Sequence, residues 1–335
     1  LEQEGLITIL PKKGLMVSGI TEEDVHSMFE MRLLVEPYAL RTYGSEIPQE
    51  ELEAFFRSVQ LKRKYFRLKD GSFIDLTRED PQLHSLRWML DNDQEYSGSK
   101  LKFHKSTAMF LEKMLPRGSR LQRQEAYERL LQDLKHPEQA SWEIPETVTA
   151  SLRPYQVVGY QWLKTLAHYG MGGILADDMG LGKTLQAIVY ICSFPGQKTL
   201  IVCPTSLAYN WQDEFQKFAP SIRTCIVQGT PEEREELIAG RQGDYDVWIT
   251  TYPLIRKDTK SYQQQKYDHI FLDEAQFIKN PSSLGAKAVK SIPADNRFAL
   301  TGTPIENALS ELWSIFDFIM PGFFMKYSRF ADAYE

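Results

Sequence analysis

The chain has 335 residues, of which 42% are hydrophobic and 25% are charged, so its composition excludes a disordered or low-complexity protein. Its length fits one large domain or two to three ordinary domains, and its apolar runs are far shorter than a membrane span. The net charge of −6 excludes a uniformly basic nucleic-acid coat but is compatible with a local basic groove.

The cysteines and histidines show no spacing typical of a metal site. The three cysteines fall in predicted core segments, which favours buried reduced thiols and a bacterial cytoplasmic location. No basic-then-apolar leader opens the sequence, and its first residue is Leu1 rather than Met. We therefore expect the chain to begin within a longer protein and to have no membrane partner.

Residues 1–46 show a predicted β-hairpin followed by a helical pattern. Two short β runs, 6–10 and 15–18, flank the turn Pro11-Lys12-Lys13-Gly14. A helical pattern then runs from Val25 to Tyr38, with an expected kink at Pro37.

This stretch resembles GntR/FadR-type transcription regulators in the segments 1–7 and 31–37 and in the turn between the two β runs. The resemblance implies the wing of a winged helix and the first helix of an effector domain. The recognition helix of that family would precede Leu1, so residues 1–46 could not read DNA on their own. The alternative is a generic hairpin followed by a helix.

Residues 47–135 read as a mostly helical accessory region with a second hairpin. The hairpin joins 62–68 to 72–76 through an Asp70-Gly71 turn, and its basic and aromatic residues would face either nucleic acid or solvent. The region resembles the helicase-associated region of bacterial Swi/Snf-type proteins. Residues 136–150 read as a linker. The predicted helices cover 49–60, 82–90, 107–115 and 121–134.

From residue 151 to residue 335, apolar strands alternate with helical stretches. Continuous apolar strands in this rhythm predict an α/β lobe with a doubly wound parallel sheet, which binds ligands at the carboxyl ends of its strands. The predicted strands are 173–176, 199–203, 224–227, 246–250, 269–272 and 297–300.

A glycine-rich loop, residues 177–184, follows the first of these strands and opens a helical pattern at 185–191. Its glycines let main-chain N–H groups turn toward phosphate oxygens, and the helix that follows presents its positive end to the anion. Lys183 is placed to reach the β and γ phosphates and the Thr184 hydroxyl to bind Mg²⁺. Asp177 stands where the general pattern has glycine. The strand–loop–helix context favours a phosphate-binding loop over an ordinary glycine turn.

Polar clusters follow four of the predicted strands, at the edge where a parallel sheet binds ligands. After the strand at 269–272, Asp273 can hold Mg²⁺, and Glu274 can orient and deprotonate an attacking water. An acidic strand end that caps a helix is the alternative. The remaining clusters are 204–211, 250–252 and 301–307.

Together these motifs resemble the first RecA-like lobe of Swi/Snf-type ATPases, within the superfamily two helicases, from Leu152 to about Gly322. Asp273-Glu274-Ala275-Gln276 matches the family's DEAH-like box, and Thr301-Gly302-Thr303 matches the motif that couples hydrolysis to DNA movement. The resemblance implies the catalytic residues Lys183, Asp273, Glu274 and Gln276, and Mg²⁺ held by Thr184 and Asp273. It also implies ATP binding by Gln156, which would read the adenine, and by Asp178, Met179, Gly180, Leu181, Gly182, Lys183 and Thr184.

By the same resemblance, five residues at the strand ends would lie along DNA phosphates, which hydroxyls and backbone amides there can contact without reading sequence. These residues are Thr205, Ser206, Asn210, Thr250 and Thr251. The family's second RecA-like lobe, which carries the arginine fingers, is expected to be missing from this chain.

We expect an ATP- and Mg²⁺-dependent translocase that acts on double-stranded DNA without sequence preference and that is truncated after its ATP-binding lobe. Alternatives are a DNA-binding regulator of the GntR type and a strand-separating helicase of superfamily two.

Overall fold

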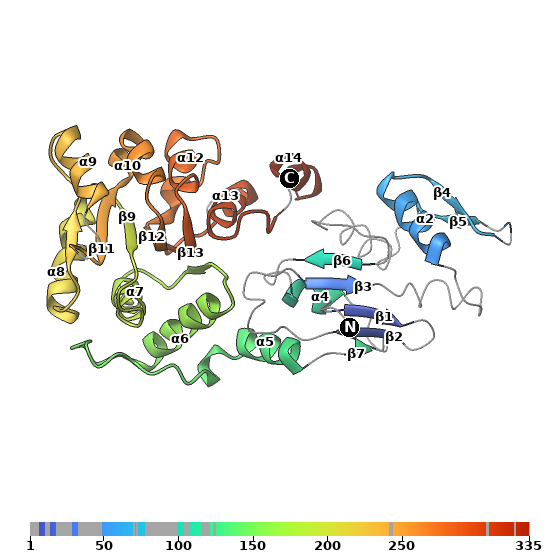
Figure 1. Ribbon diagram of the computed structural model, residues 1–335, viewed down its shortest axis with the longest axis horizontal. Helices are drawn as coiled ribbons and strands as arrows, with labels where there is room; N and C mark the ends of the chain where they lie inside the picture. Colours follow the sequence, from blue (N-terminus) through green and yellow to red (C-terminus); the bar gives the residue numbers. More distant parts are fainter. Residues whose placement is uncertain are drawn as a thin grey trace. The chain divides into compact units, whose positions relative to one another are not determined.

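The computed structural model describes residues 7–10, 14–17, 29–32, 49–69, 71, 73–77, 100–103, 108–114, 121–122, 125–240, 244–305, 308–324 and 326–334. The chain divides into two compact units, residues 1–132 and 133–335 (Figure 1). The break lies close to the predicted start of the linker at residue 136.

A five-stranded sheet organises the first unit, with the strand order β6-β3-β1-β2-β7. Its strands are β1 Ile7–Leu10, β2 Gly14–Val17, β3 Phe29–Arg32, β6 Lys100–Phe103 and β7 Leu121–Gln122. The antiparallel β1–β2 pair confirms the first predicted hairpin. The sheet also joins the described strands of residues 1–46 to strands beyond residue 100, so this stretch belongs to a larger unit.

One sequence-based prediction about this unit is wrong, because Phe29–Arg32 is a strand although a helix was predicted from Val25 to Tyr38. The described part of 47–135 is mostly helical, as predicted, but it also contains β6 and β7, which were not predicted. Both β3 and β6 alternate apolar and polar residues over only four positions, and such short alternation is easily masked by helical spacing in the flanking sequence.

The other described elements of this unit follow the prediction closely. Helix α2 (Gln49–Gln60) is followed by the hairpin of β4 (Tyr65–Arg67) and β5 (Phe73–Asp75). The Phe55 and Phe66 rings pack edge to face at 5.3 Å between centroids and fix the hairpin against α2. The later helices are α4 Ala108–Met114 and α5 Glu125–Lys135, whereas predicted helix 82–90 lies outside the described residues.

A six-stranded parallel sheet forms the centre of the second unit, in the order β10-β11-β9-β12-β13-β8. This confirms the predicted α/β class and all six predicted strands. The strands are β8 Gly173–Leu175, β9 Thr199–Cys203, β10 Thr224–Ile226, β11 Val247–Thr251, β12 Tyr267–Asp273 and β13 Ala294–Leu300. Every residue of β9 and β11 is buried, as expected for strands covered on both faces.

Helices cover both faces of this sheet (Figure 1). One layer holds α6 Pro154–His168, α7 Lys183–Cys192 and α8 Ala208–Phe218. The opposite layer holds α10 Tyr252–Lys257, α12 Leu284–Lys290 and α13 Leu309–Ile319. The shorter or peripheral elements are η3 Pro137–Gln139, η4 Thr205–Leu207, α9 Pro231–Ala239, α11 Thr259–Gln263, η5 Ala275–Ile278 and α14 Tyr327–Tyr334.

The strand register brings the carboxyl ends of the central strands to one edge. Thr251 pairs with Cys203, and Leu300 pairs with both Asp273 and Leu175. Loops that leave these strands therefore emerge side by side, which is where parallel sheets bind ligands.

The predicted linker packs against the second unit. Apart from η3, residues 136–150 form neither helix nor strand, yet Gln161 on α6 exchanges hydrogen bonds with the main chain of Trp142 at 3.1 and 2.8 Å. Thr149 donates to the Lys217 carbonyl at 2.8 Å.

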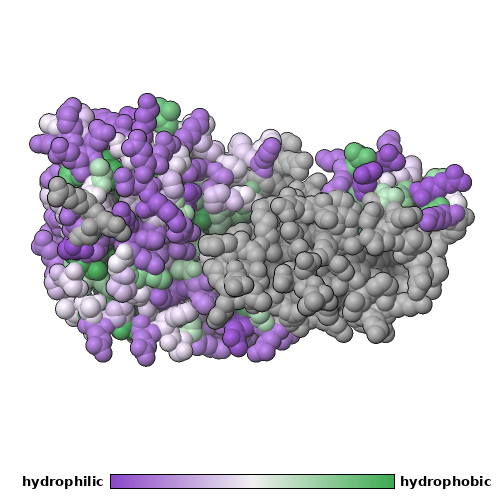
Figure 2. Space-filling view, viewed as in Figure 1, coloured by the Kyte–Doolittle hydropathy of each residue, from purple (hydrophilic) through white to green (hydrophobic). Residues whose placement is uncertain are grey.

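The coloured surface in Figure 2 is mainly hydrophilic, with hydrophobic residues scattered singly, which is normal for a folded surface. Within the described part of the chain, no helix combines the length and the apolar character that crossing a membrane requires.

Candidate nucleotide-binding site

The predicted phosphate loop runs from the end of β8 to the start of α7. Gly180 and Gly182 have φ values of +83° and +77°, a left-handed conformation that favours glycine. A Cβ atom on Gly182 would lie 2.6 Å from Nε2 of Gln156, so this position has no room for a side chain. The left-handed conformation explains both glycines, and the close approach of Gln156 is a second reason for Gly182.

Side chains from α6 and from the loop itself hold this conformation. The Tyr155 hydroxyl and the Gln156 amide both donate to the Leu181 carbonyl at 3.1 Å. Nζ of Lys183 donates to the main-chain oxygens of Asp177 at 2.7 Å and Asp178 at 3.1 Å. The Lys183 side chain therefore bends back over the loop. Its ammonium group would have to break these two hydrogen bonds in order to bind a phosphate.

Asp177, which departs from the general glycine pattern, has a structural partner. Its carboxylate accepts a hydrogen bond from the Gln186 amide on α7 at 2.9 Å. Gln186 is fully buried, and α6 passes close to it at Gly159. The aspartate therefore ties the start of the loop to the helix that follows it.

Asp273 ends β12 with its side chain 8% exposed. Its Oδ2 accepts from the indole N–H of Trp211 at 2.8 Å, and its Oδ1 accepts from the main-chain N–H of Glu274 at 3.0 Å. Burial raises the pKa of Asp273 above its usual range, while the Trp211 hydrogen bond and the Lys183 charge act in the opposite direction.

A chain of hydrogen bonds links the DEAH-like box to the predicted coupling motif. The side-chain Nε2 of Gln276 donates to the Glu274 carboxylate at 2.7 Å, and the Thr301 hydroxyl donates to the side-chain Oε1 of Gln276 at 3.0 Å. The Thr303 N–H in turn donates to the Thr301 hydroxyl at 3.1 Å. Gly302 lies next to the phosphate loop, since a Cβ there would be 3.6 Å from Met179 Cγ.

Glu274 itself adopts φ +52°, which is uncommon for a residue with a side chain. Such backbone conformations cluster at functional sites, where surrounding contacts hold them. Here the buried hydroxyl of Tyr252 donates to the Asp273 carbonyl at 2.9 Å, one peptide before Glu274.

The predicted DNA-contact residues do not share one environment. Thr205, Ser206 and Asn210 are exposed beyond the end of β9, as a phosphate contact requires. Thr250 and Thr251 are 0% and 6% exposed, so their hydroxyls do not face solvent in this structure, and their contact with DNA stays a prediction. The sheet is covered on both faces at β11, and the two threonine side chains turn into that packing.

The residues at this edge fit ATP and Mg²⁺. The two glycines and the start of α7 provide a phosphate cradle, and Thr184 stands in the first turn of that helix. Asp273 supplies a carboxylate whose two donors leave lone pairs free for a cation. No cluster of three His, Cys, Asp or Glu side chains suited to a metal occurs in the described residues, so Mg²⁺ would depend on phosphate oxygens as well.

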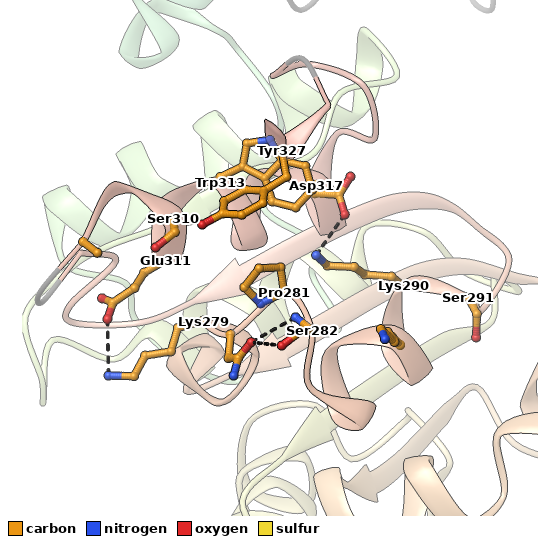
Figure 3. A pocket seen from close by; sticks show the side chains of 13 residues that line it. Lys279, Pro281, Ser282, Lys290, Ser291, Ser310, Glu311, Trp313, Asp317 and Tyr327 are labelled. Atoms are coloured by element: carbon orange, nitrogen blue, oxygen red, sulfur yellow. Dashed lines mark hydrogen bonds and ion pairs between the residues drawn. The ribbon is translucent and has the colours of Figure 1, made fainter. Parts of the chain in front are cut away.

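A separate pocket of about 850 Å³ lies between η5, α12, α13 and α14 (Figure 3). Two ion pairs line it, with Lys290 2.9 Å from Asp317 and Lys279 3.6 Å from Glu311. Trp313 forms one wall. Because these segments follow the DEAH-like box and the coupling motif, the pocket is a junction between the two motifs rather than part of the phosphate site.

The family model of the SNF2-related domain matches residues 82–335. The chain belongs to this family. The match begins inside the predicted accessory region, well before residue 151. The comparisons give no support to the regulator resemblance of residues 1–46.

Individual relatives are similar to part of this chain. The TATA-binding protein-associated factor MOT1 of Saccharomyces cerevisiae is 40% identical over 221 residues, which cover 61% of this chain and 12% of MOT1. An uncharacterized ATP-dependent helicase of Mycoplasma pneumoniae is 42% identical over 190 residues, covering 55% of this chain and 18% of the helicase. This chain thus spans less than a fifth of these relatives.

The fold agrees with solved structures. The SWI2/SNF2 ATPase core of Sulfolobus solfataricus in complex with dsDNA superposes with a TM-score of 0.52 and 40% identity, covering 57% of this chain and 41% of that one. The same core domain solved separately gives a TM-score of 0.51 at 39% identity, covering 58% and 40%. The second unit is therefore a RecA-like lobe of the Swi/Snf type.

The sequence assigned no role to three residues that hold the candidate site: Trp211, Tyr252 and Gln186. Each acts through a contact with a residue distant in sequence or through a buried side chain. Trp211 and Tyr252 belong to the predicted clusters 204–211 and 250–252, whereas nothing in the sequence pointed to Gln186.

Proposed function

We propose that the second unit binds ATP–Mg²⁺ and that the intact protein is a DNA-dependent ATPase that translocates on duplex DNA. The observation that supports this best is the hydrogen-bond chain from Glu274 through Gln276 to Thr301, beside the phosphate loop. Such a chain can transmit a change at the γ-phosphate from the DEAH-like box to the coupling motif.

Each residue has a defined task in this proposal. The loop N–H groups and Lys183 bind the phosphates, and Thr184 and Asp273 hold Mg²⁺, which neutralises charge on the phosphate oxygens. Glu274 orients water and accepts its proton. Gln276 keeps the Glu274 carboxylate in place through its amide.

Replacement of Lys183 tests the nucleotide site. Lys183→Ala removes the main positive charge at the phosphates, so calorimetry should show MgATP affinity falling about tenfold or more, since charged hydrogen bonds are worth roughly 1.5–3 kcal/mol. Lys266→Ala is the matched control, because Lys266 is an exposed lysine of the same unit that pairs with Asp295 at 3.1 Å. Equal affinities in the wild type and Lys183→Ala would refute the nucleotide assignment.

DNA binding by this chain is expected to be weak, insensitive to sequence and steeply dependent on salt. In this proposal the exposed Thr205, Ser206 and Asn210 contact DNA phosphates, and phosphate contacts release counterions. Fluorescence anisotropy with two unrelated duplexes, at several salt concentrations, measures both properties. Discrimination of about a thousandfold between the duplexes, as a specific binder shows, would contradict translocation without sequence preference.

Turnover by the 335-residue chain alone should be slow. In phosphate-loop enzymes an arginine finger contributes roughly 10³–10⁵ in rate. By family resemblance, those arginines belong to a second RecA-like lobe. Phosphate release measured with and without duplex DNA checks this expectation, and strong stimulation by DNA would show that one lobe is sufficient.

A further inference from the structure

The carboxylate of Asp273 accepts a hydrogen bond from a buried tryptophan on α8. Nε1 of Trp211 lies 2.8 Å from Oδ2 of Asp273, and the Trp211 side chain is 1% exposed. A buried N–H group needs an acceptor, and a charged acceptor gives a stronger bond than a neutral one. The contact is therefore both obligatory for Trp211 and a strong constraint on the Asp273 side chain.

The geometry leaves part of the carboxylate free. An ionised carboxylate has about four lone-pair positions. Trp211 occupies one on Oδ2, and the Glu274 N–H occupies one on Oδ1. An indole N–H is a donor only, so it fixes the rotamer of Asp273 without competing for a cation. The Tyr252 hydroxyl adds a bond to the Asp273 carbonyl and so fixes the main chain as well.

Both aromatic residues adjoin segments at the predicted DNA-facing edge. Trp211 follows the exposed Asn210 on α8, so consecutive residues of one helix turn toward solvent and toward Asp273. Tyr252 is the first residue of α10, directly after β11. The helix that would meet a phosphate backbone is thus the same helix that orients the carboxylate.

We propose that Trp211 is a positioning residue for Mg²⁺: its indole N–H holds the Asp273 carboxylate in the orientation that the ion requires and ties that orientation to α8. This inference rests on the proposed function, because it takes Asp273 as the carboxylate that meets Mg²⁺. Groups that hold metal ligands in this way typically affect metal affinity by about 10–100-fold when they are removed.

The test is the Mg²⁺ dependence of nucleotide binding by the full chain. Trp211→Phe removes the N–H and keeps an aromatic ring. Calorimetric titration with ADP and with a non-hydrolysable ATP analogue is repeated at a series of Mg²⁺ concentrations. The readout is the Mg²⁺ concentration at which half of the Mg²⁺-induced increase in nucleotide affinity is reached. We expect this concentration to rise about tenfold or more in the variant. The affinity without Mg²⁺ should stay unchanged, because Lys183 and the loop are intact.

Trp248→Phe is the matched control. Trp248 is also a buried tryptophan of this unit, 2% exposed, and its indole N–H donates to the Leu237 carbonyl at 2.9 Å. The Trp248→Phe variant should lose as much thermal stability as Trp211→Phe and keep the wild-type Mg²⁺ response. Should Trp211→Phe fail to fold, β-(3-benzothienyl)alanine at position 211, in which a sulfur atom replaces the indole N–H, provides the same comparison.

The outcomes separate the two levels of the proposal. A Mg²⁺ response in Trp211→Phe equal to that of the wild type, or an equal shift in Trp248→Phe, would overturn the role of Trp211 while nucleotide binding stands. A wild-type chain that binds no nucleotide at any Mg²⁺ concentration would instead overturn the proposed function itself, and this inference with it.

Discussion

At the scale of the single residue, a buried imidazole makes the stability of the RecA-like lobe depend on pH. His269 on β12 is 1% exposed and lies between the Tyr190 hydroxyl, 3.0 Å away, and Gln197. Burial lowers the pKa of His269 to about 4. The folded state keeps this histidine neutral at pH values where the unfolded chain, with a pKa of about 6.5, already binds a proton.

The sign of the effect follows from that difference. The contribution of His269 is fully present above about pH 6.5 and is lost as the pH falls toward 4, for a total of about 3 kcal/mol. Urea unfolding measures the free energy of unfolding at pH 7 and at pH 4.5. Its decrease between these two pH values should be about 2 to 3 kcal/mol smaller in His269→Gln than in the wild type. His168→Gln, which changes an exposed histidine, is the control. Equal pH dependence in the wild type and His269→Gln would contradict the prediction.

At the scale of the element, the contact between α6 and α7 depends on a glycine. A Cβ atom on Gly159 would lie 1.7 Å from Oε1 of Gln186, which is fully buried and cannot move into solvent. Gly159→Ala should therefore destabilise the lobe by about 1–3 kcal/mol and weaken MgATP binding, because displaced Gln186 releases Asp177. Chemical unfolding and calorimetry measure the two effects.

Gly285 on α12 is the matched control for this helix glycine, because nothing lies within 4 Å of a Cβ built there. Gly285→Ala should increase stability by about 0.5–1 kcal/mol, since alanine has less conformational freedom to lose on folding. If the two alanine variants changed stability in the same direction, the packing explanation for Gly159 would be wrong.

The helices and strands also show which parts of the fold the sequence could predict. The strands of the parallel sheet were predictable because each is a buried apolar run between turn signals, and the phosphate loop because its spacing is local. Strand β3 was not, because four alternating residues are outweighed by helical spacing around them. The contact of Trp211 with Asp273 was also hidden, since it joins residues 62 positions apart, and so was the burial of Thr250.

At the scale of the whole molecule, the chain has two compact units, and the candidate site lies entirely in the second. A fragment of residues 125–335, which keeps α5 intact, should therefore fold alone. It also retains the bond from the Tyr169 hydroxyl to Asp133 at 2.6 Å. Calorimetric melting and MgATP titration should match the lobe transition and the affinity of the full chain. Loss of either would show that the first unit completes the lobe.

The place of β8 in the sheet bears on how the lobe forms while the chain is being synthesised. Among the described strands, β8 pairs only with β13, which inserts between β12 and β8. At synthesis rates of about 5–20 residues per second, the ribosome makes β13 on the order of ten seconds after β8. Until then the phosphate loop has its glycines and its lysine but no neighbouring strand to fix them. A nascent chain that has not reached residue 300 would therefore carry the sequence of the nucleotide site without its shape.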